Sequence, residues 1–190
     1  MFRADNDRAA VQSEIIFPIR FNGINTKTWG GTTFIIHASA GDWNSEMGVD
    51  GGWVGLVARK EFANLFSDLS GGADNRAIFD SGSNLNIASV SDFFGNGGLK
   101  VKKFKNRTST GIVGSNQTHV DTDFPVFRLA DAYLMYAELA AKGLGSKATA
   151  RGYINTLRTR ANAATIATDA EVTADFVLDE RARELYWEGH

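Results

Sequence analysis

Three segments in the last third of the chain decide its fold. They are RLADAYLMYAE at Arg128–Glu138, NTLRTRA at Asn155–Ala161 and DERARELYWEG at Asp179–Gly189. In and around each segment, apolar residues recur every three or four positions, which is the spacing of one helix face. The sequence therefore predicts three amphipathic helices after residue 120.

The ends of these helices also carry sequence signals. Pro125 is expected in the first turn of the first helix, because the first turn needs no backbone donor there, and Gly143 is expected just after its end. Ser146 and Thr173 are expected to cap the second and third helices. Two helices joined by a short turn form a hairpin close to the roughly 34-residue length of a tetratricopeptide unit.

The three motifs, in this order, resemble the C-terminal portion of SusD/RagB family proteins. Members of that family are outer-membrane glycan-binding lipoproteins of starch-utilisation-type systems in Bacteroidota. Weaker matches extend the resemblance upstream, to Glu14–Ile19, Gly52–Gly55, Asp74–Arg76 and Lys103–Asn106. The family's signal peptide, lipidated cysteine, earlier helical repeats and Arg-rich continuation have no counterpart in this sequence. The chain is thus expected to be a fragment of a larger SusD-like domain.

The expected fold is mainly α, with tetratricopeptide-type helical hairpins and a loop-rich region with short β-strands. Residues 1–120 are Gly-, Asn- and Ser-rich, and residues 121–190 form the helical region. Within residues 1–120 we expect short strands at Glu14–Ile19, Thr33–His37, 77–80 and 99–104. A single helix is expected there, at Leu56–Phe66.

Composition excludes several classes of function. The net charge of −2 argues against nucleic acid as a partner. Cysteine is absent, which removes thiolate metal sites, and the three isolated histidines lack metal-ligand spacing. We therefore expect neither a metal nor a cofactor. The one basic cluster, at Lys100, Lys102, Lys103 and Lys105, is interpreted as the solvated face of a strand.

Tryptophans in the loop-rich region are candidate sugar-binding residues. The indole ring offers a flat apolar face for the C–H groups of a sugar, at small entropic cost. Trp29 and Trp43 are therefore candidates, although each ring could instead plug a loop onto the core. Trp53 is interpreted as a packing residue. Side chains that could bind sugar hydroxyls nearby are Asn25, Asp42 and Asn44.

Charged residues in the helical region suggest a scaffold role. Arg158, Arg160, Glu180 and Glu184 are predicted to form a structural ion-pair network. The alternative, an acid/base pair of Glu180 and Glu184, conflicts with the neighbouring arginines, which would keep both carboxylates ionised. We therefore expect no catalytic residues and no enzyme activity.

The family resemblance implies non-catalytic binding of an oligosaccharide or polysaccharide at the outer face of the bacterial outer membrane. It implies a lipid anchor in the full-length protein. It further implies delivery of the ligand to a TonB-dependent transporter of the SusC type. The alternative is a tetratricopeptide-like module that binds a protein and no sugar.

Overall fold

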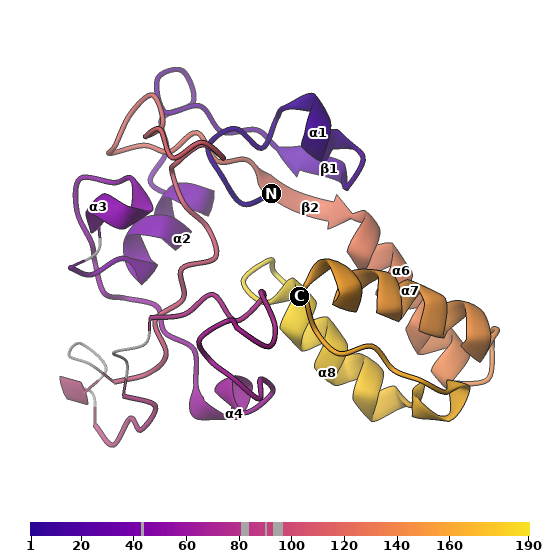
Figure 1. Cartoon of the computed structure of the whole chain (residues 1–190). Helices are drawn as coiled ribbons and strands as arrows, with labels where there is room; N and C mark the ends of the chain where they lie inside the picture. Colours follow the sequence, from indigo (N-terminus) through magenta and orange to yellow (C-terminus); the bar gives the residue numbers. More distant parts are fainter. Residues whose placement is uncertain (43, 81–83, 90, 93–96) are drawn as a thin grey trace.

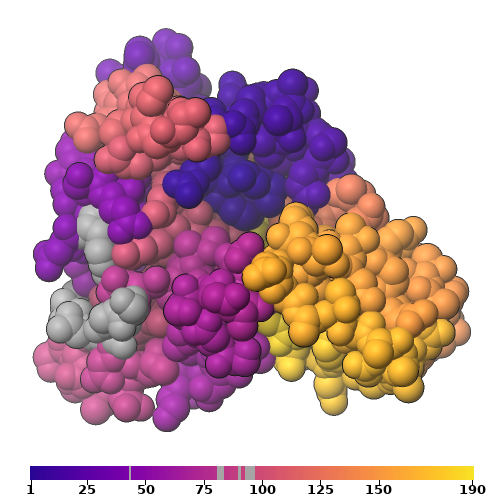
Figure 2. Space-filling model, in the orientation of Figure 1, coloured from indigo at the N-terminus to yellow at the C-terminus, as the bar shows by residue number. Residues whose placement is uncertain are grey.

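The computed structural model describes residues 1–42, 44–80, 84–89, 91–92 and 97–190. Helices α6, α7 and α8 form one side of the molecule, and a loop-rich part with short helices forms the other (Figure 1). The space-filling view shows the same division, with the helical residues gathered in one lobe (Figure 2). The expected mainly α fold is confirmed.

The helical lobe comprises α6 (Leu129–Ala141), α7 (Lys147–Arg160), the 3-10 turn η1 (Asp169–Glu171) and α8 (Ala174–Leu185). Helix α6 packs against both α7 and α8. The core of the helical lobe contains, among others, the buried residues Leu134, Ile154, Leu157, Val177 and Leu185. Burial of each such side chain stabilises the fold by about 1.5–3 kcal/mol, so this core carries much of the stability of the lobe.

Two of the predicted helix caps are confirmed. The Ser146 hydroxyl accepts a hydrogen bond from the Thr149 N–H, and the Thr173 hydroxyl accepts one from the Phe176 N–H. Gly143 follows α6 with φ of 80°, a conformation that costs glycine little. These ends are determined by local chemistry, which explains why the sequence located them.

Two antiparallel strands connect the lobes: β1 (Ile15–Ile19) and β2 (Phe124–Arg128). The strand expected at Glu14–Ile19 is confirmed. The prediction that Pro125 opens a helix is wrong, because residues 124–128 pair with β1 and α6 begins only at Leu129. A two-stranded sheet leaves Pro125 at an edge, where the missing N–H is tolerated.

The loop-rich part contains several short helices, so the expectation of a single helix is wrong. They include α1 (Ala9–Gln12), α2 (Gly31–Ser39), α3 (Asn44–Met47) and α4 (Lys60–Ala63). The predicted strand at Thr33–His37 lies inside α2, where Ile36 enters a buried cluster with Met47, Val49 and others. The helix expected at Leu56–Phe66 is reduced to α4.

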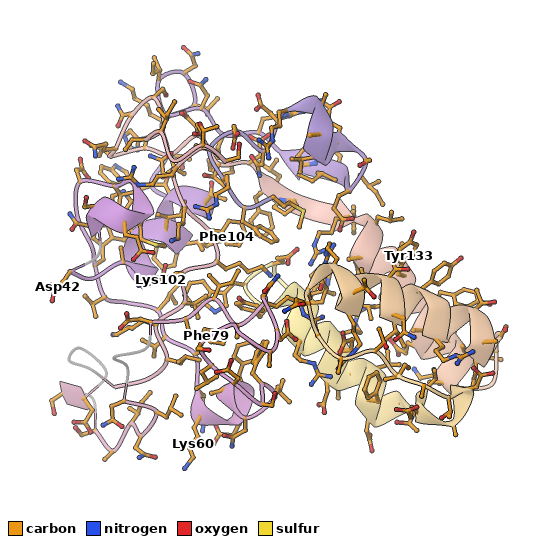
Figure 3. The ribbon with its side chains drawn as sticks, in the orientation of Figure 1. Asp42, Lys60, Phe79, Lys102, Phe104 and Tyr133 are labelled. Atoms are coloured by element: carbon orange, nitrogen blue, oxygen red, sulfur yellow. The ribbon has the colours of Figure 1, made fainter. Side chains whose placement is uncertain are left out.

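The segments expected as strands at 77–80 and 99–104 form only isolated bridges, such as Phe79 with Val101. The interpretation of the lysine cluster as a solvated face is also wrong, because Lys100 and Lys103 are buried. The Lys103 ammonium donates to Glu188 and to the Glu184 and Tyr186 carbonyls. The neighbouring Phe104 points into the interior of the loop-rich part (Figure 3).

Candidate glycan-binding site

The segment after α2 folds back onto the end of that helix. The last carbonyl groups of a helix have no partners within it. Here the N–H groups of Trp53, Gly55 and Val54 donate to the carbonyls of His37, Ala38 and Ala40. Residue 52 must be glycine, because a Cβ there would lie 2.5 Å from the Ala40 carbonyl oxygen. These contacts position the Trp53 ring over α2.

Three aromatic rings form an exposed cluster, which we call the aromatic platform: Trp29, Phe34 and Trp53. Their exposed fractions are 59%, 45% and 41%, so solvent reaches all three. The Trp29 and Trp53 centroids are 6.0 Å apart with a 44° angle between the ring planes. Phe34 lies 6.1 Å from Trp53. Large apolar rings left exposed together typically mark a binding site.

His37 packs against the platform from the side of α2. His37 lies one turn after Phe34 on the same face of α2, since residues three apart on a helix are neighbours. Its ring stacks on Trp53, with centroids 4.7 Å apart and planes 17° apart. The backbone of Val54 next to Trp53 has φ of 50°, an unusual conformation for a β-branched residue. Such strain tends to occur at functional sites.

A loop far along the chain completes the surroundings. The His119 ring meets Trp29 edge-on at 4.7 Å, and the Gly23 N–H donates to Asp121. This loop also forms a polar hollow of about 520 Å³, lined by Asp50 and residues 113–118. Two residues of the hollow are close in sequence to the aromatic cluster: Asp50 lies three residues before Trp53, and Thr118 precedes His119. The segments that carry the rings thus also carry hydrogen-bonding groups.

Asn106 holds these loops in place from the interior. Its side-chain amide donates to the carbonyls of Gly48 and Asn116, and its carbonyl accepts from the Asp121 N–H. The side chain is fully buried, so no water can replace these bonds. Asn106 thus links the segment before Trp53 to the loop that carries His119.

Replacing Asn106 by alanine should leave the Gly48 and Asn116 carbonyls and the Asp121 N–H without their partner. We expect a loss of about 2 to 4 kcal/mol in the free energy of unfolding, since each unsatisfied buried group is costly. Chemical denaturation would measure it. Asn25→Ala, a change at an exposed asparagine, should leave the stability almost unchanged. Equal effects for both variants would contradict this role of Asn106.

The structure places the predicted sugar-binding residues unevenly. Trp29 belongs to the platform, whereas Trp43 lies outside the described residues. Asn25 is exposed in the loop before Trp29. Asp42 and Asn44 follow the other end of α2, which is about 13 Å long at 1.5 Å per residue. The Asp42 side chain points outward at the edge of the loop-rich part (Figure 3).

The sequence assigned Trp53 only a packing role and did not single out Phe34 or His37. Trp53 does pack on His37, but it is also exposed beside Trp29. The three-residue spacing of Phe34 and His37 places them on one face only if residues 31–39 form a helix. Because the sequence predicted a strand there, it did not indicate that the two side chains lie together.

The four predicted network residues lie together between α7 and α8. Arg158 donates to Glu180 at 2.6 Å, and Arg160 pairs with Glu184. Further arginines join this network, among them Arg76, Arg128 and Arg183. Arg76 binds Glu180 at 2.8 Å, and Arg128 binds Glu184 at 2.7 Å. The network joins the helical lobe to the loop-rich part.

The charges around Glu184 determine its protonation. Burial by itself would raise the pKa of Glu184, but the guanidinium groups of Arg128, Arg160 and Arg76 outweigh burial and lower this pKa to about 2. Burial lowers the pKa of Lys103 to about 8, although Glu188 opposes that effect. A Glu184 that is ionised at neutral pH is unsuited to act as a general acid there.

Among the described residues, no group of three or more His, Asp or Glu side chains is placed to hold a metal ion. Within the same residues, no helix has both the length and the hydropathy needed to cross a membrane.

Comparison with known proteins identifies the family. The SusD family model matches residues 83–190. The starch-binding protein SusD of Bacteroides thetaiotaomicron is 32% identical over 234 aligned residues, which include all of this chain and 41% of SusD. The chain therefore spans less than half the length of this relative.

Solved structures show the same fold. A SusD homologue from Bacteroides thetaiotaomicron is 28% identical with a TM-score of 0.61, over 93% of this chain and 36% of the homologue. Surface glycan-binding protein A from the same organism, in complex with laminarihexaose, is 22% identical with a TM-score of 0.65. That match covers 98% of this chain and 43% of the other protein. This chain belongs to the SusD family.

Proposed function

We propose that this chain binds a glycan on the aromatic platform and does not cleave it. The observation that carries the proposal is the exposure of Trp29, Phe34 and Trp53 side by side. Sugar rings present C–H faces that stack on aromatic rings, and rigid aromatic side chains lose little entropy on binding. The SusD relative is a starch-binding protein, which supports the same class of ligand.

The angle between the rings restricts the shape of the glycan. Trp29 and Trp53 are inclined by 44°, so their faces do not form one flat surface. A flat, ribbon-like chain would stack on only one of the two rings. A curved or helical chain can turn from one ring to the next. We therefore expect curved glucans to bind more tightly than cellulose-like chains.

Polar groups around the platform would bind the sugar hydroxyls. The hollow lined by Asp50 and residues 113–118 offers a carboxylate, hydroxyls and amides. Asn25 is exposed on the loop before Trp29. Asp42 and Asn44, at the other end of α2, would contact only a longer ligand. The glycan would thus extend from the rings over the hollow.

The acidic groups near the platform have structural partners, which supports binding without hydrolysis. Asp50 accepts a hydrogen bond from the Thr118 hydroxyl. Asp121 accepts from the Ser115 hydroxyl at 2.7 Å and from the Gly23 N–H at 2.8 Å. Hydrolysis of a glycoside requires a free acid and a second carboxylate on opposite sides of the bond. These two carboxylates hold loops together instead.

The cellular role is proposed from family membership. The chain would act on the outer face of the bacterial outer membrane, held there by a lipid anchor of the full-length protein. It would deliver bound glycan to a SusC-like TonB-dependent transporter. The helical lobe, with its charge network, would supply the rigid scaffold.

Affinity electrophoresis in gels containing single polysaccharides tests the proposal. Starch, laminarin and a cellulose derivative would be compared with a gel that contains no glycan. We expect retardation on at least one curved glucan. Trp29→Ala or Trp53→Ala should reduce the affinity by about tenfold or more, since truncating an aromatic anchor of a binding site typically costs about 2 kcal/mol or more. Release of reducing ends should not exceed the blank.

Phe127→Ala is the matched control, because Phe127 is an exposed aromatic residue on β2 outside the platform. It should bind like the unmodified chain. Retardation that survives both tryptophan changes would contradict the platform as the site. Release of sugar by the purified chain would contradict the absence of catalysis.

A protein-binding module without sugar binding is the second candidate function. A hollow of about 750 Å³ lies between α4 and α8, lined by Phe62, Leu178, Leu185 and other residues. Leu178 is 67% exposed there. Absence of retardation on every glycan, with a folded chain, would favour this function over sugar binding.

A further inference from the structure

His37 makes contacts that a neutral histidine cannot satisfy. Its Nδ1 lies 2.6 Å from the Gly51 carbonyl oxygen, and its Nε2 lies 3.1 Å from the Thr118 carbonyl oxygen. A backbone carbonyl oxygen only accepts hydrogen bonds. Neutral imidazole has only one N–H. Its other nitrogen would then point its lone pair at the lone pairs of a carbonyl oxygen, and the two would repel each other. Only the doubly protonated ring donates to both.

The contacts of the ring oppose the cost of burying its charge. His37 is only 1% exposed, and burial disfavours a charged group, so its neighbours must offset that cost. The ring stacks on Trp53 with centroids 4.7 Å apart. A cation within about 6 Å of an indole centroid is attracted to the ring face. Two carbonyl oxygens and one indole face thus surround the imidazole with partial negative charge.

The two carbonyls belong to the two segments that the proposed site brings together: the one that carries Trp53 and the loop that carries His119. Gly51 lies two residues before Trp53, and Thr118 precedes His119, whose ring meets Trp29. The bonds from His37 therefore join the segment that carries Trp53 to the loop beside Trp29. Loss of either bond would change the spacing of the two indole rings.

We propose that His37 is a positioning residue of the platform: as an imidazolium it cross-links the Gly51 and Thr118 segments and sets the geometry of Trp29 and Trp53. Rising pH removes one of its two protons and breaks one bond. The cross-link is thus complete at low pH and lost at high pH. The consequence for glycan affinity rests on the proposed function, whereas the protonation state of His37 does not.

Other titratable groups face this histidine and must be separated from it. Helix α2 carries no other titratable side chain. Asp50 precedes Gly51 and binds the Thr118 hydroxyl, and His119 follows Thr118. Among the described residues, no carboxylate forms an ion pair with the His37 ring. The titration of Asp50 and that of His119 are therefore the two alternatives to exclude.

Nuclear magnetic resonance of the chain labelled with ¹⁵N-histidine tests the protonation directly, without glycan, from about pH 5.5 to 8.5. We expect both ring nitrogens of His37 to carry protons at the low end. The amide signals of Trp53 and His119 should shift as one proton is lost. A single protonated nitrogen over the whole range would overturn the inference, whatever the chain binds.

The second readout is glycan affinity over the same range. We expect affinity to fall by about three- to tenfold as pH rises, the effect of one lost hydrogen bond. His37→Gln cannot carry a charge and should bind with no pH slope. His190→Gln, a change at a histidine outside the platform, should keep the slope, as should His119→Gln and Asp50→Asn. Loss of the slope in either of the last two would assign it to that group and contradict the role of His37.

The two readouts separate the two proposals. A chain that binds no glycan but shows doubly protonated His37 refutes the proposed function and retains the cross-link. A chain that binds glycan with neutral His37 refutes the cross-link and retains the function.

Discussion

Replacing Arg128 by methionine is expected to lower the free energy of unfolding by about 3 to 5 kcal/mol, the usual cost of removing one partner from a buried ion pair. Arg128 is 2% exposed. Its guanidinium donates to Glu188 at 2.6 Å, to Glu184 at 2.7 Å and to Glu14 at 2.9 Å. Without it, Glu184 and Glu188 stay buried and lose a major cation. Methionine keeps most of the volume, so the loss measures charge rather than packing.

Urea denaturation followed by circular dichroism would measure this loss. Lys142→Met is the matched control, because Lys142, directly after α6, forms an exposed pair with Glu138 of that helix. Exposed pairs contribute little, so the control should unfold close to the unmodified chain. An Arg128→Met chain as stable as the control would show that the network is dispensable.

Acid should remove about 3 kcal/mol of stability through Glu184 alone. The folded chain holds the pKa of Glu184 at about 2, against an ordinary value of 4.5, because three guanidinium groups surround it. A carboxylate with a lowered pKa binds fewer protons in the folded state than in the unfolded state. Its contribution is therefore complete above pH 4.5 and is lost as the pH falls towards 2.

Glu184→Gln removes this contribution, and the carboxylates outside the network titrate alike in both chains. The difference in unfolding free energy between the two chains should be largest at neutral pH. It should shrink as the pH falls from 4.5 towards 2. A difference that stays constant over this range would contradict the lowered pKa of Glu184.

Features that depend on neighbours in the sequence could be predicted from it. Ser146 and Thr173 cap their helices through bonds to residues three positions later, so a single local pattern suffices. Arg158 and Glu180 lie on two helices that pack together within the last third of the chain, so their pairing needs no distant segment. The family motifs also lie in this region, and they led to the correct family.

Features that depend on distant partners were missed. Residues 124–128 became a strand because β1, more than a hundred residues earlier, pairs with them. Lys103 is buried because Glu188, 85 residues later, neutralises it. Residues 31–39 are rich in β-branched side chains, yet they form a helix that buries Ile36 and receives the N–H groups after residue 52.

The sequence by itself determined the helices of the last third, their caps, the charge partners between α7 and α8, and membership of the SusD family. Only the tertiary structure decided the platform. Trp29, Trp53 and His119 are brought together from segments separated by about 24 and 66 residues, through hydrogen bonds such as those of His37 and Asn106. No local sequence pattern predicts that these residues come together, because the contacts that stabilise the arrangement exist only after the chain has folded.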